Sequence, residues 1–235
     1  MCGRYVLATP IDELASFFEA RPAPGLDSGW GANYNIAPTR TVVCLSPGPD
    51  GGRSLDLYRW GLIPSWAKEQ TVGNRLFNAR AETVAVKPSF RAAFHSRRLA
   101  VLSDGFYEWR RGPGSRRQPY FLSRADGSPM AFAGLWESWR DPRAQGDEAG
   151  WIRTCTIITT EANPEVAPIH DRMPVLLEHD VLGAWLDPAV AERDELEAML
   201  HPSPAGTLAV RAVSPRVGSV RNNGADLIEE MAPGG

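Results

Sequence analysis

Short apolar and β-branched runs, separated by turns rich in glycine and proline, recur along this chain and predict β-strands. The clearest run, at 98–103, is apolar through its middle and is expected to be a buried strand. Further strands are expected at 41–45, 55–60, 119–122, 130–135, 151–160 and 207–213. The Ser-Pro-Gly-Pro-Asp-Gly-Gly turn at 46–52 predicts that the first two of these form a hairpin.

Helical periodicity is confined to short segments. Thr9 is expected to cap a helix whose first position is Pro10, and Ser89 is expected to cap another over 90–94. The apolar positions of the first helix, which share one face, are Ile11, Leu14, Ala15 and Phe18. Two more helices are expected at 180–186 and 189–200.

The order of these elements indicates the fold class. About seven strands and four short helices do not alternate as βαβ units, so the pattern favours an α+β protein. We expect a strongly curved or barrel-like antiparallel sheet with short helices at its periphery. The sequence contains no internal repeat and no domain linker, so residues 1–235 are expected to form one domain.

Charge is distributed unevenly along the sequence. The formal net charge is −3, yet residues 75–117 carry ten Lys or Arg against three acids. From residue 178 onward the balance reverses, with ten acids against four arginines. This distribution is compatible with a basic face on an acidic body and equally with an ordinary solvated surface, and both interpretations remain open.

The three cysteines, Cys2, Cys44 and Cys155, have neither CxxC spacing nor a histidine cluster beside them. The sequence therefore predicts no zinc site, no disulfide framework and no metal or cofactor. Cys44 lies within a predicted strand, where a free cysteine usually acts as a small buried hydrophobe. The pattern of a signal peptide and an apolar run long enough to span a membrane are both absent from the sequence, so we expect a cytoplasmic protein.

The first four residues, Met1-Cys2-Gly3-Arg4, hold unusual chemistry. Removal of Met1 would give Cys2 a free amine two carbons from its thiol. Near neutral pH part of such an amine is unprotonated. It can form an imine with an aldehyde, and the thiol can then close a thiazolidine ring. Because many chains begin with Met-Cys, these four residues alone leave a functional and an incidental interpretation open.

Two further polar side chains stand in distinctive surroundings. Glu108 lies among three aromatic residues at 106–109, where desolvation would raise its pKa and suit it to acid catalysis. His170 lies in a loop between two prolines and belongs to the side-chain type that titrates near neutrality. The alternative interpretations are that Glu108 is exposed at the end of a strand and that His170 has a structural role. Pro64 restricts the backbone before Trp66, which is expected to lie on the surface.

Taken together, six ordered motifs resemble the SRAP (SOS response-associated peptidase) family over nearly the whole chain. They are Met1 to Tyr5, Asn35 to Pro38, Trp60 to Trp66, Asn78 to Glu82, Gly105 to Trp109 and His170 to Pro174. The segment 213–228 also resembles the end of the family, although Gly218-Ser219 stands where an Asn-Asn pair is expected. That departure concerns packing more than chemistry.

The resemblance implies a protein that forms a covalent crosslink to abasic sites in single-stranded DNA and protects them during replication and repair. Cys2 would trap the ring-opened aldehyde as a thiazolidine, after removal of Met1. Glu108 would transfer protons during ring opening and imine formation, and His170 would assist ring opening or the reverse steps. Asn78 would hold Cys2 or the sugar by hydrogen bonds. A lyase-type activity is implied as well.

The resemblance also implies which residues hold the DNA. Arg80 and Arg172 would grip the phosphates beside the lesion, with Arg4 a weaker candidate for the same work. Trp66 and Pro38 would stack on or wedge against neighbouring bases. Association with the nucleoid after damage and contact with the replication machinery are further expectations. A monomer is our default expectation.

Three other functions remain open from the sequence. The family name suggests a thiol peptidase in which Cys2 and His170 cleave a peptide bond, including the bond that releases Met1. Met-Cys-Gly also opens N-terminal-nucleophile glutamine amidotransferases, although no partner domain is recognisable here. The third alternative is a non-catalytic single-strand binding module that uses Trp66 and the arginines, with Cys2 incidental.

Overall fold

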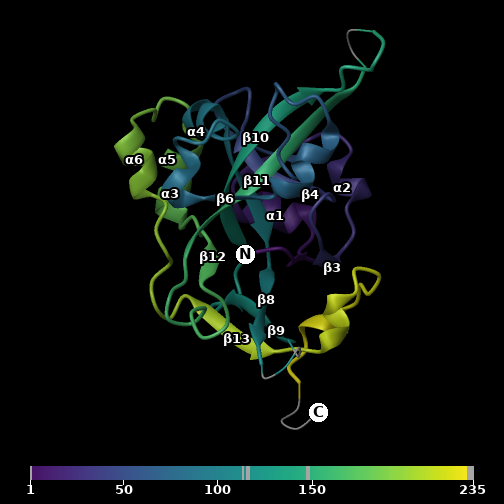
Figure 1. The fold of residues 1–235 in the computed structure, drawn as a ribbon, viewed down its shortest axis with the longest axis vertical. Helices are drawn as coiled ribbons and strands as arrows, with labels where there is room; N and C mark the ends of the chain where they lie inside the picture. The colour runs from purple at the N-terminus through teal and green to yellow at the C-terminus, as the bar shows by residue number, and fades with distance from the viewer. Residues whose placement is uncertain (1, 113, 115–116, 147–148, 232–235) are drawn as a thin grey trace.

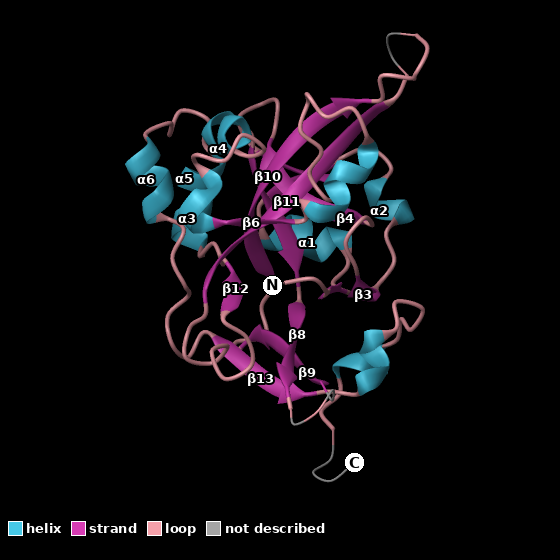
Figure 2. Cartoon of the chain, viewed as in Figure 1, coloured by secondary structure: helices cyan, strands magenta, loops and turns pink. Residues whose placement is uncertain are grey.

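A closed five-stranded barrel is the centre of the computed structural model, which describes residues 2–231 except 113, 115, 116, 147 and 148 (Figures 1 and 2). Its strands are β4 (Thr41–Pro47), β5 (Arg53–Trp60), β7 (Arg98–Ser103), β10 (Met130–Arg140) and β11 (Trp151–Glu161). Antiparallel pairing runs in the order β5, β4, β7, β10 and β11, and a parallel pairing of β11 with β5 closes the ring. The expected α+β class and barrel-like sheet are confirmed, whereas the closing pair is parallel.

Short strands extend the barrel, and a second sheet packs at its end. β2 (Ala20–Pro22) pairs with β5, while β6 (Asn78–Arg80) and β12 (Arg172–Pro174) pair with β11. The second sheet has the order β13 (Leu208–Ala212), β9 (Arg117–Arg124), β8 (Gly105–Arg111), β1 (Tyr5–Leu7) and β3 (Asn33–Ile36). Because β7 leads into β8 through one residue, the two sheets are directly connected.

The helices are short and lie outside the barrel, as the sequence predicts (Figure 2). They are α1 (Ile11–Phe17), α2 (Leu26–Gly29), α3 (Ala81–Val84), α4 (Arg91–Ser96), α5 (His179–Leu186) and α6 (Arg193–Ala198). Short 3₁₀ helices span Gln70–Arg75, Pro215–Gly218 and Ala225–Ile228. None of the helices in the described part of the chain is long and apolar enough to cross a membrane.

Aromatic rings join the barrel to the second sheet. Tyr5 of β1 packs edge-on against Trp60 and Phe132, with ring centroids 5.3 and 6.1 Å apart, and Phe106 of β8 meets Phe132 at 5.9 Å. Such pairs add about 0.5–1.5 kcal/mol beyond the area they bury. Cys44 is fully buried, as predicted, and its sulfur lies 3.9 Å from that of Cys155 without a disulfide bond.

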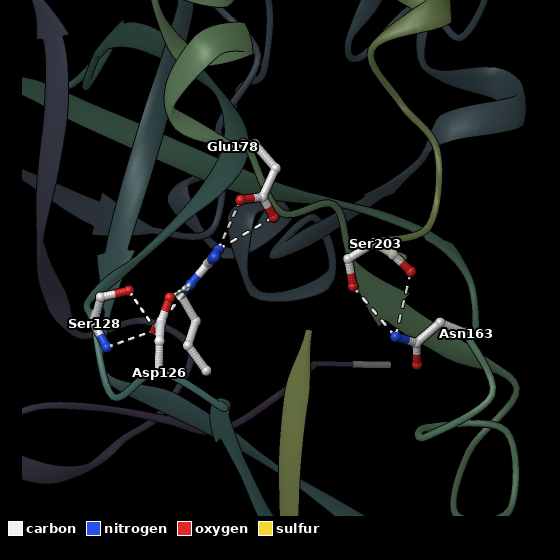
Figure 3. Close-up of polar contacts among 6 residues, drawn as sticks. Asp126, Ser128, Asn163, Glu178 and Ser203 are labelled. Atoms are coloured by element: carbon white, nitrogen blue, oxygen red, sulfur yellow. Dashed lines mark hydrogen bonds and ion pairs between the residues drawn. The ribbon is translucent and has the colours of Figure 1, made fainter. Parts of the chain in front are cut away.

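Polar contacts also hold the outer segments (Figure 3). The Nη1 atom of Arg124, at the end of β9, donates to both carboxylate oxygens of Glu178 at 3.1 and 2.9 Å, which ties the second sheet to the start of α5. The buried Asn163 amide donates to the carbonyl and hydroxyl oxygens of Ser203 at 3.4 and 3.3 Å. These contacts position the segments on either side of β12.

The helix caps that we expected are wrong. Pro10 takes the cap position of α1, and the Thr9 hydroxyl instead donates to Asp104 Oδ1 at 2.7 Å. Asp104 also accepts from the backbone N–H groups of Ala8 and Thr9, so a tertiary contact outcompetes the local cap. No side-chain cap from Ser89 forms at α4, and α6 is shorter than the expected 189–200.

Arg98 fastens two helices to the barrel although its side chain carries a charge. The residue is 3% exposed, and its guanidinium donates only to backbone carbonyls at the ends of α4 and α5. The acceptors, at 2.6–3.2 Å, are the carbonyl oxygens of Phe94, His95, Trp185, Asp187 and Val190. The planar fork therefore satisfies carbonyls that the helix ends leave without partners.

We expect Arg98→Met to lower the free energy of unfolding by about 3 kcal/mol or more, because it leaves five carbonyls unsatisfied in the interior. Denaturant unfolding followed by circular dichroism measures the loss. Arg91→Met is the matched control, since Arg91 is an exposed residue on α4. A loss below about 1 kcal/mol for the Arg98 variant would contradict the assigned role.

Candidate active site

Strand β1 places the amino-terminal residues beside Glu108. It pairs antiparallel with β8, with Tyr5 opposite Phe106, and the N–H of Tyr107 donates to the carbonyl of Arg4 at 2.9 Å. Continuing this register by two residues puts Gly3 opposite Glu108. On the other side β1 pairs with β3, with Tyr5 opposite Ile36. The start of the chain therefore lies between two strands.

Cys2 is fully buried and is held by a side chain from the barrel. The amide nitrogen of Asn78 donates to the carbonyl oxygen of Cys2 at 2.7 Å. Asn78 begins β6, which pairs with β11 at Ile157, so its position depends on the barrel and not on β1. Met1 lies outside the described residues, and its removal stays a prediction.

Burial controls the protonation of the two groups in this site. Glu108 is 3% exposed, and desolvation raises the pKa of its carboxyl group, with the nearby charge of His170 opposing the rise. Burial also raises the pKa of the Cys2 thiol, and the charge of Glu108 adds to that effect. The expected desolvation of Glu108 is therefore confirmed. The thiol is held in its protonated form.

His170 is half-buried and precedes β12. Its Nδ1 atom accepts a hydrogen bond from the backbone N–H of Arg172 at 3.0 Å and lies 2.9 Å from Asp171 Oδ1. A neutral ring accepts from Arg172, which leaves the proton on Nε2, whereas a protonated ring can donate to Asp171. Protonation of Nδ1 would therefore exchange the hydrogen bond from Arg172 for one to Asp171.

The four predicted catalytic residues come from four separate segments. Cys2 precedes β1, Asn78 begins β6, Glu108 lies in β8 and His170 lies before β12. These four residues nevertheless lie in one site. Asn78 donates a hydrogen bond to the Cys2 carbonyl, and Glu108 interacts through its charge with both Cys2 and His170. Their catalytic roles stay predictions. Across the described ranges, no three His, Cys, Asp or Glu side chains are grouped to hold a metal ion.

Arg172, a predicted phosphate ligand, is already paired within the protein. Its Nη1 and Nη2 atoms donate to the carboxylate of Glu82 at 2.5 and 3.0 Å, and Nη2 also donates to the carbonyl of Thr159. The Arg172 side chain is 13% exposed and that of Glu82 is 53% exposed. A phosphate would therefore have to compete with Glu82 for this guanidinium.

The other predicted DNA ligands differ in how accessible they are. Arg80 is exposed and lies two residues from Asn78 on the same face of β6. Trp66 is 64% exposed, which confirms its predicted place on the surface, and Pro38 is half-buried. Arg4 instead donates to the Asn35 side chain at 2.7 Å and to the Val217 carbonyl at 2.8 Å. Those bonds suit Arg4 to holding the protein together.

Some of the cations of residues 75–117 make contacts within the protein. Arg98 lies in the core, and Arg97 pairs with Glu137 at 3.0 Å. The guanidinium of Arg110 lies over the ring of Tyr120, 5.0 Å from its centroid. Arg116 lies outside the described residues. The buried Arg98 and the paired Arg97 therefore contribute little to any basic face.

Sequence reasoning missed residues that hold the site together. The Asn35 amide nitrogen donates to the carbonyls of Ser219 and Asn222 at 2.9 and 2.8 Å, while its oxygen accepts from Arg4. It lies in a recognised motif, but nothing local indicates that its partners are almost 190 residues away. The pairing of Glu82 with Arg172 was missed for the same reason.

The raised pKa of Glu108 predicts how pH affects stability. In the folded state the carboxyl group keeps its proton to higher pH than in the unfolded chain, so stability falls as pH rises from the unfolded pKa through the folded one. Glu108→Gln removes this penalty. We therefore expect the melting temperature of the variant, relative to the wild type, to be higher at pH 8 than at pH 4. Each kcal/mol shifts melting by about 2–4 °C in a domain of this size.

Scanning fluorimetry of the wild type and Glu108→Gln at both pH values tests this expectation. Glu13→Gln, on an exposed position of α1, is the control for losing one acidic side chain. Equal pH profiles for the wild type and the Glu108 variant would show that burial does not shift the carboxyl group in solution.

Comparison with known proteins finds relatives along nearly the whole chain. The family model for SOS response associated peptidase (SRAP) matches residues 1–220. The chain is 38% identical over 230 residues to the Bacillus subtilis abasic site processing protein YoqW, covering 97% of this chain and 99% of that one. It is 34% identical over 236 residues to the Escherichia coli abasic site processing protein YedK, covering 98% and 100%.

Solved structures show the same fold. A crystal structure of a Bacteroides thetaiotaomicron protein superposes with a TM-score of 0.86 at 22% identity, covering 98% of this chain and all of the other. A Bordetella bronchiseptica protein superposes with a TM-score of 0.74 at 26% identity, covering 91% of this chain and all of the other. The family match over most of the chain and relatives above 30% identity lead to one conclusion: the chain belongs to the SRAP family.

Proposed function

We propose that this protein processes abasic sites by capturing them covalently in single-stranded DNA. The observation that carries the proposal is the meeting of Cys2, Asn78, Glu108 and His170 in one buried site. Relatives that match nearly the whole chain are named abasic site processing proteins. The sugar of an abasic site exposes an aldehyde when its ring opens, and an amino-terminal cysteine is suited to trap that group.

The capture proceeds in two bond-forming steps. The Cys2 amine, free once Met1 has been removed, adds to the aldehyde carbon and then loses water to give an imine. The Cys2 sulfur next adds to the imine carbon, and the thiol proton passes to the imine nitrogen, which closes the thiazolidine. A thiol whose pKa is raised by burial keeps the proton that this second step uses.

Glu108 supplies the protons for the first step. Its carboxyl group, whose pKa burial raises, protonates the sugar ring oxygen as the ring opens and protonates the hydroxyl that leaves as water. His170 lies within reach of its charge and returns protons to it, or supports the reverse steps that release the strand. Asn78 touches the Cys2 carbonyl and acts as a positioning residue.

The flanking strand lies on the surface beside the site. Arg80 and Arg172 take phosphates, and the exposed Trp66 stacks on a base with a gain of about 1–3 kcal/mol. Pro38 wedges against a neighbouring base. Arg4 contributes to DNA binding indirectly, because it holds Asn35 and Val217 in place by hydrogen bonds. A lyase-type cleavage of the strand, a monomeric state, a cytoplasmic location and contact with replication proteins stay predictions.

The state of the thiol favours capture over hydrolysis. A thiol peptidase or a cysteine amidotransferase attacks through a thiolate, which requires a lowered pKa. Burial and the neighbouring Glu108 raise the pKa of Cys2 instead. We therefore favour covalent capture over peptide hydrolysis as the function of this site.

Covalent capture is tested by mixing the protein, with Cys2 confirmed as its first residue by mass spectrometry, with single-stranded DNA that bears one abasic site. We expect a protein–DNA band that survives a denaturing gel and disappears in Cys2→Ala and in protein that retains Met1. Cys155→Ala, which alters a buried cysteine outside the site, is the matched control and should crosslink. Absence of the band with wild-type protein and intact lesion would sink the proposal.

The pairing of Arg172 with Glu82 leads to a separate prediction. Glu82→Gln removes the competing carboxylate, so we expect the affinity for single-stranded DNA to rise several-fold. The slope of log K against log salt should steepen by about 0.7, the value for one added phosphate contact on a single strand. Fluorescence anisotropy at several salt concentrations measures both quantities.

Glu13→Gln is again the control, because it removes the same charge from exposed α1. Equal effects of the two substitutions would mean that Glu82 acts only through net charge. An unchanged salt slope for Glu82→Gln would show that the released Arg172 does not contact a phosphate.

A further inference from the structure

A cavity of about 450 Å³ opens beside the segment that follows β3. Its volume lies in the range of ligand-binding pockets, about 300–1,000 Å³. The residues that matter for its chemistry are Trp30, Asn33, Arg40, Val220 and Asn223, and none of its described lining residues is acidic. The four predicted catalytic residues, Cys2 among them, do not line this pocket.

Its polar side chains offer donors and few acceptors. The side-chain oxygen of Asn33 accepts the N–H of Asn35 at 3.0 Å, and that of Asn223 accepts the N–H of Tyr34 at 2.7 Å. The two amide nitrogens have no hydrogen-bond partner within the described part of the chain, nor has the guanidinium of Arg40. A ligand that satisfies these donors must bring acceptor oxygens and is favoured by negative charge.

Apolar side chains also line the cavity. Trp30 lines the cavity as a half-buried ring, and Val220 is 48% exposed at its edge. An aromatic face beside phosphate-type donors is the combination with which proteins hold nucleotides of a single strand. Inorganic phosphate alone would leave the apolar walls uncovered.

The pocket lies close to the candidate active site. Ala37, which lines it, continues β3 beyond Ile36, and Ile36 is opposite Tyr5 of β1. The antiparallel register therefore runs Ala37 alongside Arg4, two residues from Cys2, or about 7 Å along the strand. A strand whose lesion is held at Cys2 would therefore have this pocket within reach.

We propose that the pocket binds a nucleotide flanking the captured lesion. Its phosphate accepts hydrogen bonds from Arg40 and the amides of Asn33 and Asn223, and its base lies against Trp30 and Val220. The proposal rests on the proposed function, because it takes the ligand to be the same DNA strand. It adds a second point of attachment that is independent of Cys2 chemistry.

Asn33→Asp and Asn223→Asp test the pocket with little change of shape. Aspartate retains the oxygen that accepts the Asn35 or Tyr34 N–H but replaces the outward NH₂ donor with a charged oxygen. The probe is fluorescent single-stranded DNA with a tetrahydrofuran in place of the abasic sugar, which cannot form an aldehyde or crosslink. We expect each variant to bind this DNA about tenfold more weakly than the wild type.

Gln145→Glu controls for added negative charge. It changes an exposed residue in the β10–β11 connection, which projects far from β3 in Figure 1. Arg40→Gln is a second variant, and it breaks no hydrogen bond within the described part of the protein. We expect it to weaken binding and to reduce the slope of log K against log salt by about 0.7. Melting temperatures establish that each variant is folded.

Shortened oligonucleotides separate a local contact from general repulsion. The penalty of the aspartate variants should vanish when nucleotides are removed from one end of the probe and persist when they are removed from the other. Variants that bind like Gln145→Glu, a penalty that survives trimming at both ends, or wild-type protein that binds no single strand would each overturn the pocket. Crosslinking by wild-type protein, measured separately, shows whether the proposed function stands when the pocket fails.

Discussion

The pairing of β1 with β3 and β8 is the constraint on which the site depends. Chain ends usually fray, and a reactive group on a mobile end would meet its proton donor only rarely. Here Tyr5 is fixed by backbone pairing on both sides and by aromatic contacts with Trp60 and Phe132. Cys2 is therefore held three residues from a buried anchor, where Asn78 and Glu108 reach it.

The same burial decides the chemistry that this site favours. Removing a carboxyl group and a thiol from water disfavours the ionised form of both, so Glu108 and Cys2 keep their protons to higher pH. Condensation of an amine with an aldehyde uses these protons, whereas hydrolysis through a thiolate does not. The buried guanidinium of Arg98, by contrast, is stabilised by hydrogen bonds to five backbone carbonyls.

Net charge says little about how this protein would hold DNA. The chain carries −3 overall, and its arginines serve different ends: Arg98 and Arg4 fasten segments together, while Arg172 is paired with Glu82. Arg80 is exposed, and Arg40 has no side-chain partner within the described part of the chain. Affinity for a polyanion would depend on those few side chains, on stacking at Trp66 and on release of Arg172 from its carboxylate.

The sequence alone determined most of the long strands, though not β8, together with the α+β class and the motifs of the family, because periodicity and apolar runs are local properties. It also predicted that Glu108 is desolvated, which its exposed fraction of 3% confirms. Three-residue strands such as β1 and β6 could not be recognised, because their pairing energy comes from partners far along the chain. The Thr9 cap failed against Asp104 for the same reason. Only the tertiary structure decided that Asn78 meets Cys2, that Glu82 occupies Arg172 and that Asn35 fastens residues 219 and 222, since each joins segments that no local pattern connects.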